Sequence, residues 1–121
     1  MIESILKFFQ KDNSKPKEIY EAIKMEFPLN EIETLIHSGM NLDVKDESGL
    51  TALHYAVESG KLELVKLLLE NQANPNIGDS DMVTPYNIAK SYSGLEDIVE
   101  LLLKHGADPK ILDKHGKNYL M

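Results

Sequence analysis

A chain of 121 residues is of a size for one folded domain, and the absence of cysteine excludes a disulfide framework and thiol chemistry. The net charge is −7 and all 13 basic residues are lysine, which argues against nucleic-acid binding because that function needs a positive, usually arginine-rich surface. The acidity either keeps the protein soluble or steers a basic protein partner.

The chain shows no signal for membrane insertion or export. It lacks a run of about 18 apolar residues, so we expect no membrane-spanning segment. Residues 1–9 are too short and too charged for a signal peptide. The expected location is the cytoplasm, and delivery by a secretion system that reads other signals stays open.

Residues 1–16 are predicted to form an amphipathic capping helix and a polar linker. Four apolar residues recur at helical spacing, namely Ile2, Ile5, Leu6 and Phe9. A membrane-surface helix favours a lysine-rich polar face, but here Lys7 is offset by Glu3. We therefore expect the apolar stripe to cover the open end of the fold.

Helices are predicted in pairs along the middle of the chain. The first two pairs span residues 17–27, 29–36, 51–58 and 62–70. Thr51 is a suitable N-cap for the third of these helices, and Gly60 a suitable end. Gly39 is likewise suited to the left-handed conformation that ends a helix.

The sequence repeats itself at a nearly constant distance. The motif TALHYA at 51–56 returns thirty-three positions later as TPYNIA at 84–89. The motif LVKLLL at 64–69 returns thirty-four positions later as IVELLL at 98–103. A period of about 33 residues predicts an all-α stack of helical repeats, since one such unit cannot bury its apolar face alone.

These motifs, together with GADP at 106–109, resemble the ankyrin repeat, closely over 41–116 and more weakly over 17–40. In that family each unit is a β-turn finger followed by two antiparallel helices. The resemblance implies a solenoid of about three helix pairs with short fingers and a truncated last repeat. The predicted domain is 17–121, with repeats at 17–45, 46–78 and 79–112 and a partial repeat at 113–121. It also implies that His54 hydrogen-bonds between fingers.

The resemblance further implies a protein-binding scaffold with no cofactor. In the family the partner surface comprises the finger tips and the exposed ends of the first helices. On this sequence these are Glu47, Ser48, Leu50, Glu58, Ser59, Ser80, Asp81, Val83, Ser91, Tyr92, Lys114, His115 and Lys117.

The middle repeat departs from this pattern twice. Met82 replaces the finger glycine found as Gly49 and Gly116, which predicts a remodelled finger. The methionine either offers an adaptable contact or folds back onto the neighbouring finger. One extra residue within 90–94 puts Tyr92 at or beside an exposed helix end, where it serves as an interface anchor or packs locally. We expect this patch to be the centre of binding.

The repeat pattern stops after a finger, so the apolar outer face of residues 84–103 needs a cover. The apolar tail 119–121 is one candidate, and a partner or a second copy of the chain is another.

No metal or catalytic site is predicted. His105 and His115 flank Asp108 and Asp113, but in loops and without the helical spacing of a metal motif. Phosphate-binding and nucleophile-elbow motifs are missing, so we expect no enzyme.

The predicted function is a protein–protein interaction module. Its more specific form is an inhibitor or immunity protein that neutralises a basic toxin enzyme. The alternatives are a self-associating scaffold that uses the open C-terminal face, giving a weak homo-oligomer, and a secreted bacterial effector.

Overall fold

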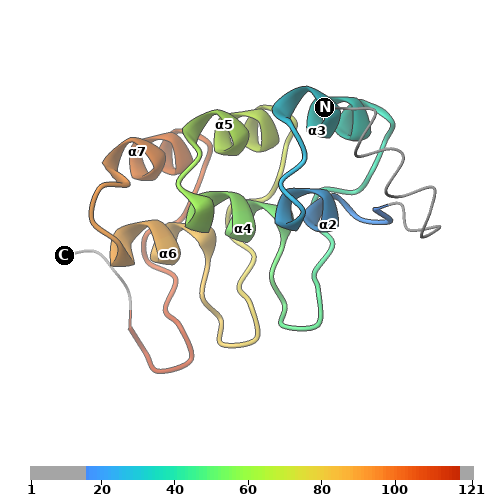
Figure 1. The fold of residues 1–121 in the computed structure, drawn as a ribbon. Helices are drawn as coiled ribbons and strands as arrows, with labels where there is room; N and C mark the ends of the chain where they lie inside the picture. The colour runs from blue at the N-terminus through green and yellow to red at the C-terminus, as the bar shows by residue number, and fades with distance from the viewer. Residues whose placement is uncertain (1–15, 118–121) are drawn as a thin grey trace.

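The structure, a computed structural model, describes residues 16–117, which contain six α-helices and no strand. The helices are α2 (Ile19–Lys24), α3 (Leu29–His37), α4 (Ala52–Ser59), α5 (Leu62–Glu70), α6 (Pro85–Ser91) and α7 (Glu96–Lys104). The helices form pairs in chain order, and Figure 1 shows these pairs side by side, with a long loop extending from the base of each pair. The predicted all-α stack of helix pairs is confirmed, while the helix predicted within 1–16 and the tail 119–121 lie outside the described residues.

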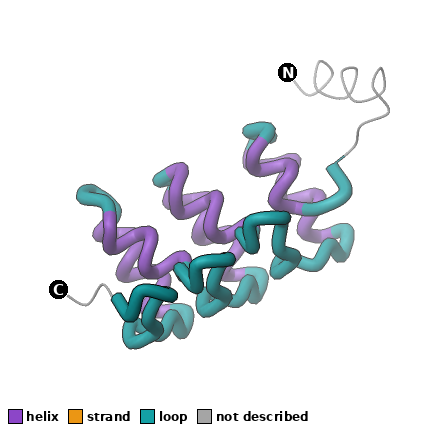
Figure 2. The backbone as a smooth tube through the Cα atoms, turned by 90° about the horizontal axis from the view of Figure 1, so that it is seen from below, coloured by secondary structure: helices purple, strands orange, loops and turns teal. Residues whose placement is uncertain are grey.

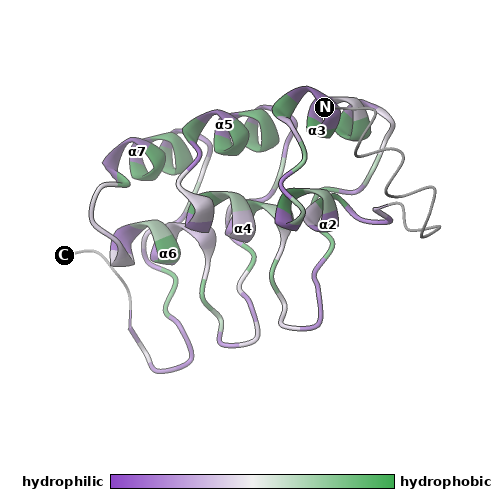
Figure 3. Cartoon of the chain, viewed as in Figure 1, coloured by the Kyte–Doolittle hydropathy of each residue, from purple (hydrophilic) through white to green (hydrophobic). Residues whose placement is uncertain are grey.

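The helices form two layers. Helices α2, α4 and α6 make an inner row beside the loops, and α3, α5 and α7 make an outer row (Figures 1 and 2). The inner row packs closely because Ala22, Ala56 and Ala89, all buried, leave room for the neighbouring helices. Hydrophobic residues gather on the helices, and the loop tips are mainly hydrophilic (Figure 3). None of the helices between residues 16 and 117 has the length and apolar character needed to cross a lipid bilayer.

Local capping sets the helix ends. The Thr51 hydroxyl accepts a hydrogen bond from the N–H of His54 at 3.4 Å, and the Thr84 hydroxyl accepts one from Asn87 at 3.2 Å. Both are N-caps, as the sequence predicts for Thr51. Helix α2 is shorter than the predicted 17–27, because Glu26 takes a left-handed conformation with φ 59°.

His54 joins one repeat to the next from a fully buried position. Its Nδ1 accepts a hydrogen bond from the N–H of Thr51 at 3.0 Å. The proton is therefore on Nε2, which donates to the Val83 carbonyl at 2.8 Å. The predicted hydrogen bond from this histidine to the next finger is confirmed. The corresponding residue of the following repeat, Asn87, reaches only the Ile111 carbonyl, at 3.5 Å.

Burial lowers the pKa of His54, despite the hydrogen bond to Val83 and nearby carboxylates that favour the charged form. The unfolded chain takes up this proton near pH 6.5, and the folded protein only at a lower pH. The contribution of His54 to the free energy of unfolding is therefore fully present above pH 6.5. It declines as the pH falls from there towards the pKa of the folded protein.

We expect the melting temperature to fall when the pH is lowered from 7.5 to 5.5, because protonation of His54 favours the unfolded chain. The matched control is His54→Asn, which places the residue of the next repeat at this position. The variant should show a smaller fall over the same range in thermal unfolding followed by circular dichroism. Equal falls in both proteins would contradict the assignment.

Candidate functional site

Three loop tips share one hydrogen-bond pattern, and we name them finger 1 (46–50), finger 2 (79–83) and finger 3 (113–117). In each finger the carboxylate of the first residue accepts hydrogen bonds from the N–H groups two and four residues later, at 2.8–2.9 Å. These residues are Asp46, Asp79 and Asp113. The N–H of each also donates to the carbonyl four residues later, at 2.8–2.9 Å. Every finger therefore presents its tip in the same conformation.

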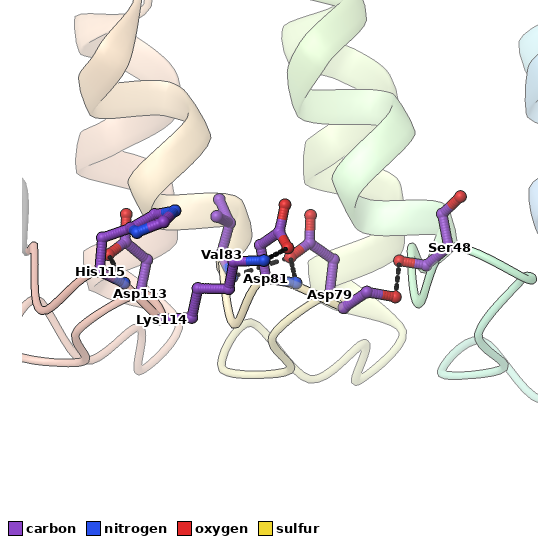
Figure 4. Close-up of polar contacts among 8 residues, drawn as sticks. Ser48, Asp79, Asp81, Val83, Asp113, Lys114 and His115 are labelled. Atoms are coloured by element: carbon purple, nitrogen blue, oxygen red, sulfur yellow. Dashed lines mark hydrogen bonds and ion pairs between the residues drawn. The ribbon is translucent and has the colours of Figure 1, made fainter.

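The fingers are bonded edge to edge into one row. Ser80 donates both its N–H and its hydroxyl to the Ser48 carbonyl, at 3.0 and 2.7 Å. The Lys114 N–H donates to the Asp81 carbonyl at 2.8 Å, and its ammonium lies 2.8 Å from an Asp81 carboxylate oxygen (Figure 4). That ion pair raises the pKa of Lys114. We call this arrangement the finger row.

The structure divides the predicted partner-binding residues into two groups. The finger row holds Glu47, Ser48, Leu50, Ser80, Asp81, Met82, Val83, Lys114, His115 and Lys117. The second group, Glu58, Ser59, Ser91 and Tyr92, lies at the C-terminal ends of α4 and α6. Each of these helix ends is separated from its finger by the length of the helix, about 12 Å for the eight residues of α4 at a rise of about 1.5 Å per residue. All are exposed except Leu50 and Val83, which are partly buried.

The predicted remodelling of finger 2 is wrong. Met82 adopts φ 64°, the conformation of Gly49 and Gly116 at φ 80° and 76°. Its N–H bonds to the Asp79 carbonyl at 2.8 Å, as the corresponding glycines do in their fingers. The left-handed conformation costs a non-glycine residue about 1 kcal/mol, and the shared hydrogen bonds of the finger outweigh that cost. The Met82 side chain is 54% exposed.

Finger 2 has a glycine at its base, which sequence reasoning did not notice. A Cβ atom on Gly78 would lie 3.0 Å from the Cα and carbonyl carbon of Met82. The other fingers have Lys45 and Leu112 at this position. In finger 2, therefore, the residue at position 82 has a side chain and the residue at position 78 has none.

Tyr92 lies directly after α6, at the helix end that its position in the sequence predicts. Its backbone is extended, with φ −111° and ψ 146°, and its side chain is 51% exposed. The residue borders a hollow of about 270 Å³ that also involves Val99 and Glu100 of α7. This exposed ring is available to a partner.

A tyrosine cluster between repeats was missed by sequence reasoning. The rings of Tyr20 and Tyr55 stack with centroids 6.4 Å apart and an angle of 25° between their planes. The Tyr55 hydroxyl donates to the Asp46 carboxylate, and the Lys24 ammonium lies 5.3 Å from the Tyr55 ring centroid. Burial and Asp46 raise the pKa of Tyr55 to about 12. Two tyrosines in successive inner helices, about one repeat apart, were the available signal.

Of the residues weighed as metal ligands, the two aspartates have structural roles. Asp113 and Asp108 accept hydrogen bonds from backbone N–H groups two residues later, at 2.9 Å. Within residues 16–117, no group of three or more histidine, aspartate or glutamate side chains is placed to hold a metal ion.

Stacked helix pairs whose fingers line up along one edge define a helical repeat protein of the solenoid class. The family model for ankyrin repeats, in three copies, matches residues 19–113, and the chain belongs to this family.

Similar proteins come from bacteria, viruses and mammals. An ankyrin repeat protein of Rickettsia bellii is 41% identical over 90 residues, covering 70% of this chain and 26% of its own length. One from Fowlpox virus is 33% identical, covering 95% of this chain and 25% of its own length. The sheep ankyrin repeat, SAM and basic leucine zipper domain-containing protein 1 is 37% identical, covering 66% of this chain and 18% of its own length. The chain spans about a quarter or less of these relatives.

Replacing Met82 by glycine should stabilise the protein by about 1 kcal/mol, because glycine adopts a positive φ without steric cost. The exposed methionine side chain loses little buried surface in the exchange. Urea unfolding would measure the effect, with Met82→Ala as a control that keeps the Cβ atom and therefore the strain. Equal stability of the glycine and alanine variants would refute this account of finger 2.

Proposed function

We propose that the protein binds a protein partner on the surface formed by the finger row and the exposed ends of α4 and α6. Ankyrin repeats are generally protein–protein interaction modules, and they are typically non-enzymatic. The observation that carries the proposal is the finger row, in which exposed tips are fixed in one order by hydrogen bonds. A pre-ordered surface loses little conformational entropy when a partner binds.

The centre of this surface is the middle repeat. Met82 and Tyr92 are large, exposed and apolar or aromatic, the character expected of side chains that enter a partner's pockets. Met82 is a contact of this surface, although its finger is not remodelled. The strained left-handed backbone at Met82 is what functional sites often retain against stability.

The proposed partner is basic. The chain has a net charge of −7, which accelerates encounter with a positively charged protein and favours the bound state. The most specific form of the proposal is inhibition of a basic enzyme, such as a nuclease toxin, by covering its active site.

Self-association is the second candidate. Leu103 at the end of α7 and Leu112 before finger 3 are 42% and 45% exposed, so a second copy has apolar surface to cover. Light scattering after size exclusion, from micromolar to millimolar protein, decides this point. A constant monomer mass would exclude it.

Tyr92→Ala and Met82→Asp should each weaken binding of a purified partner by about 5- to 30-fold, corresponding to roughly 1–2 kcal/mol. Aspartate tolerates the left-handed conformation at 82, so this variant should still fold. The partner is first isolated by affinity capture, and affinities are then measured by interferometry at several salt concentrations.

The control is Lys66→Ala, on the outer helix α5, where the exposed lysine lies away from the proposed surface. Its affinity for the partner should equal that of the wild type. Unchanged affinity in both the Tyr92 and Met82 variants would move the binding site elsewhere. If the affinity does not fall as salt is added, the proposal that the partner is basic is wrong.

A further inference from the structure

A groove of about 600 Å³ opens between the turn that joins α2 to α3 and the turn that joins α4 to α5. It borders the tyrosine cluster, since Lys24 and Tyr55 belong to both. Its volume lies within the range of about 300–1,000 Å³ that is typical of ligand pockets. Two of the predicted partner-binding residues, Glu58 and Ser59, line it, whereas Met82 and Tyr92 do not.

The floor of the groove is apolar. Ile23, Ile32 and Leu64 are buried side chains at its base, and Phe27 is partly buried beside them. Leu29 stands on the edge and is largely exposed. This surface suits a large aliphatic or aromatic side chain, whose burial is favourable because it leaves water.

The rim carries a strained carboxylate. Glu26 has φ 59°, at the position where the next two repeats have Gly60 and Gly94 with φ 72° and 88°. Glutamate in this conformation is less stable than glycine. Among the described residues, its carboxylate takes part in no hydrogen bond or ion pair that would offset the strain. Strain retained without an internal benefit indicates a functional role.

Further carboxylates lie on the groove and beside it, at the tyrosine cluster. Glu58 also stands on the rim, and its carboxylate has no hydrogen-bond or ion-pair partner within residues 16–117. Burial raises the pKa of Tyr20, and nearby carboxylates raise it further; these are Glu21, Asp46, Glu18 and Glu47. The lysines on the groove are Lys24 and Lys61. The position of Lys24 over the Tyr55 ring shows that this aromatic face accepts a cation.

We propose that this groove binds a partner segment in which a large apolar side chain stands next to a lysine or arginine. The apolar side chain fills the floor, and the cation is held by Glu26 and Glu58 on the rim. The inference rests on the proposed function, namely that the protein binds a protein. A second copy of this chain fits the groove less well, because its own charge of −7 is unfavourable next to the carboxylates of the rim and of the tyrosine cluster.

The test begins with a phage-displayed library of random twelve-residue peptides, selected on the full-length protein. Enriched peptides should share an apolar residue adjacent to lysine or arginine. A fluorescent peptide of the consensus sequence is then titrated by anisotropy against the variants. Glu26→Gly and Glu58→Gln should each lower its affinity about 2- to 5-fold, the effect of losing one partly exposed ion pair. Substituting alanine for its apolar residue should abolish measurable binding.

The glycine exchange separates binding from folding. Glu26→Gly should raise the melting temperature by about 4 °C and lower the affinity for the peptide, because it removes backbone strain and a negative charge together. Gln72→Gly removes the same kind of strain after α5, where φ is 75°, and should leave peptide affinity unchanged. A loss of affinity caused by damaged structure would instead be accompanied by a lower melting temperature.

Two results would overturn the groove proposal. One is a library that yields no peptide, or a consensus without basic residues. The other is unchanged affinity in both glutamate variants. If Tyr92→Ala no longer binds the peptide and Glu26→Gly still does, the groove proposal fails and the proposed function stands. If only Glu26→Gly loses affinity for the peptide, the groove proposal is supported. The role of the Tyr92 surface is then decided by the affinity of Tyr92→Ala for the purified partner.

Discussion

The hydrogen bonds accepted by the first aspartate of each finger are the interaction on which the rest of the structure depends. Asp46, for example, binds the N–H groups of Ser48 and Leu50, which would otherwise face water in a mobile loop. The tip is thereby held so that the Ser48 carbonyl faces the next finger. Finger-to-finger bonds and the His54 bridge to Val83 both need this placement. Repeats then stack in one register, and each buries the apolar face that its neighbour leaves open.

Most of the fold could be predicted because its signals are local and repeated. The apolar spacing of residues 62–70 and the capping group of Thr51 act within one helix, so the sequence pattern is sufficient there. Finger 2 could not be predicted, because its conformation results from a competition. The preference of Met82 against positive φ is an intrinsic property, whereas the opposing bonds to Asp79 and the room beside Gly78 exist only in the folded loop.

The candidate site was predictable only as a surface. Exposure of the finger tips follows from the repeat pattern, since each repeat places equivalent residues outward, and the extra residue within 90–94 places Tyr92 at the end of α6. The groove between the first two repeats does not follow from it. Helix α2 belongs to the most divergent repeat, so nothing in the sequence marks Glu26 as the counterpart of Gly60. The Tyr20–Tyr55 stack likewise depends on how two successive inner helices pack, which spacing alone does not determine.

The two junctions of the finger row differ in their chemistry, and this makes them respond differently to salt. Ser48 and Ser80 are joined by neutral hydrogen bonds, which salt affects little. Asp81 and Lys114 add an exposed ion pair, which dissolved ions screen within about 10 Å at moderate salt. The strength of the first junction is therefore nearly independent of salt, whereas the second junction weakens as the ionic strength rises. Salt or a charged partner therefore acts more on the contact between fingers 2 and 3 than on the contact between fingers 1 and 2.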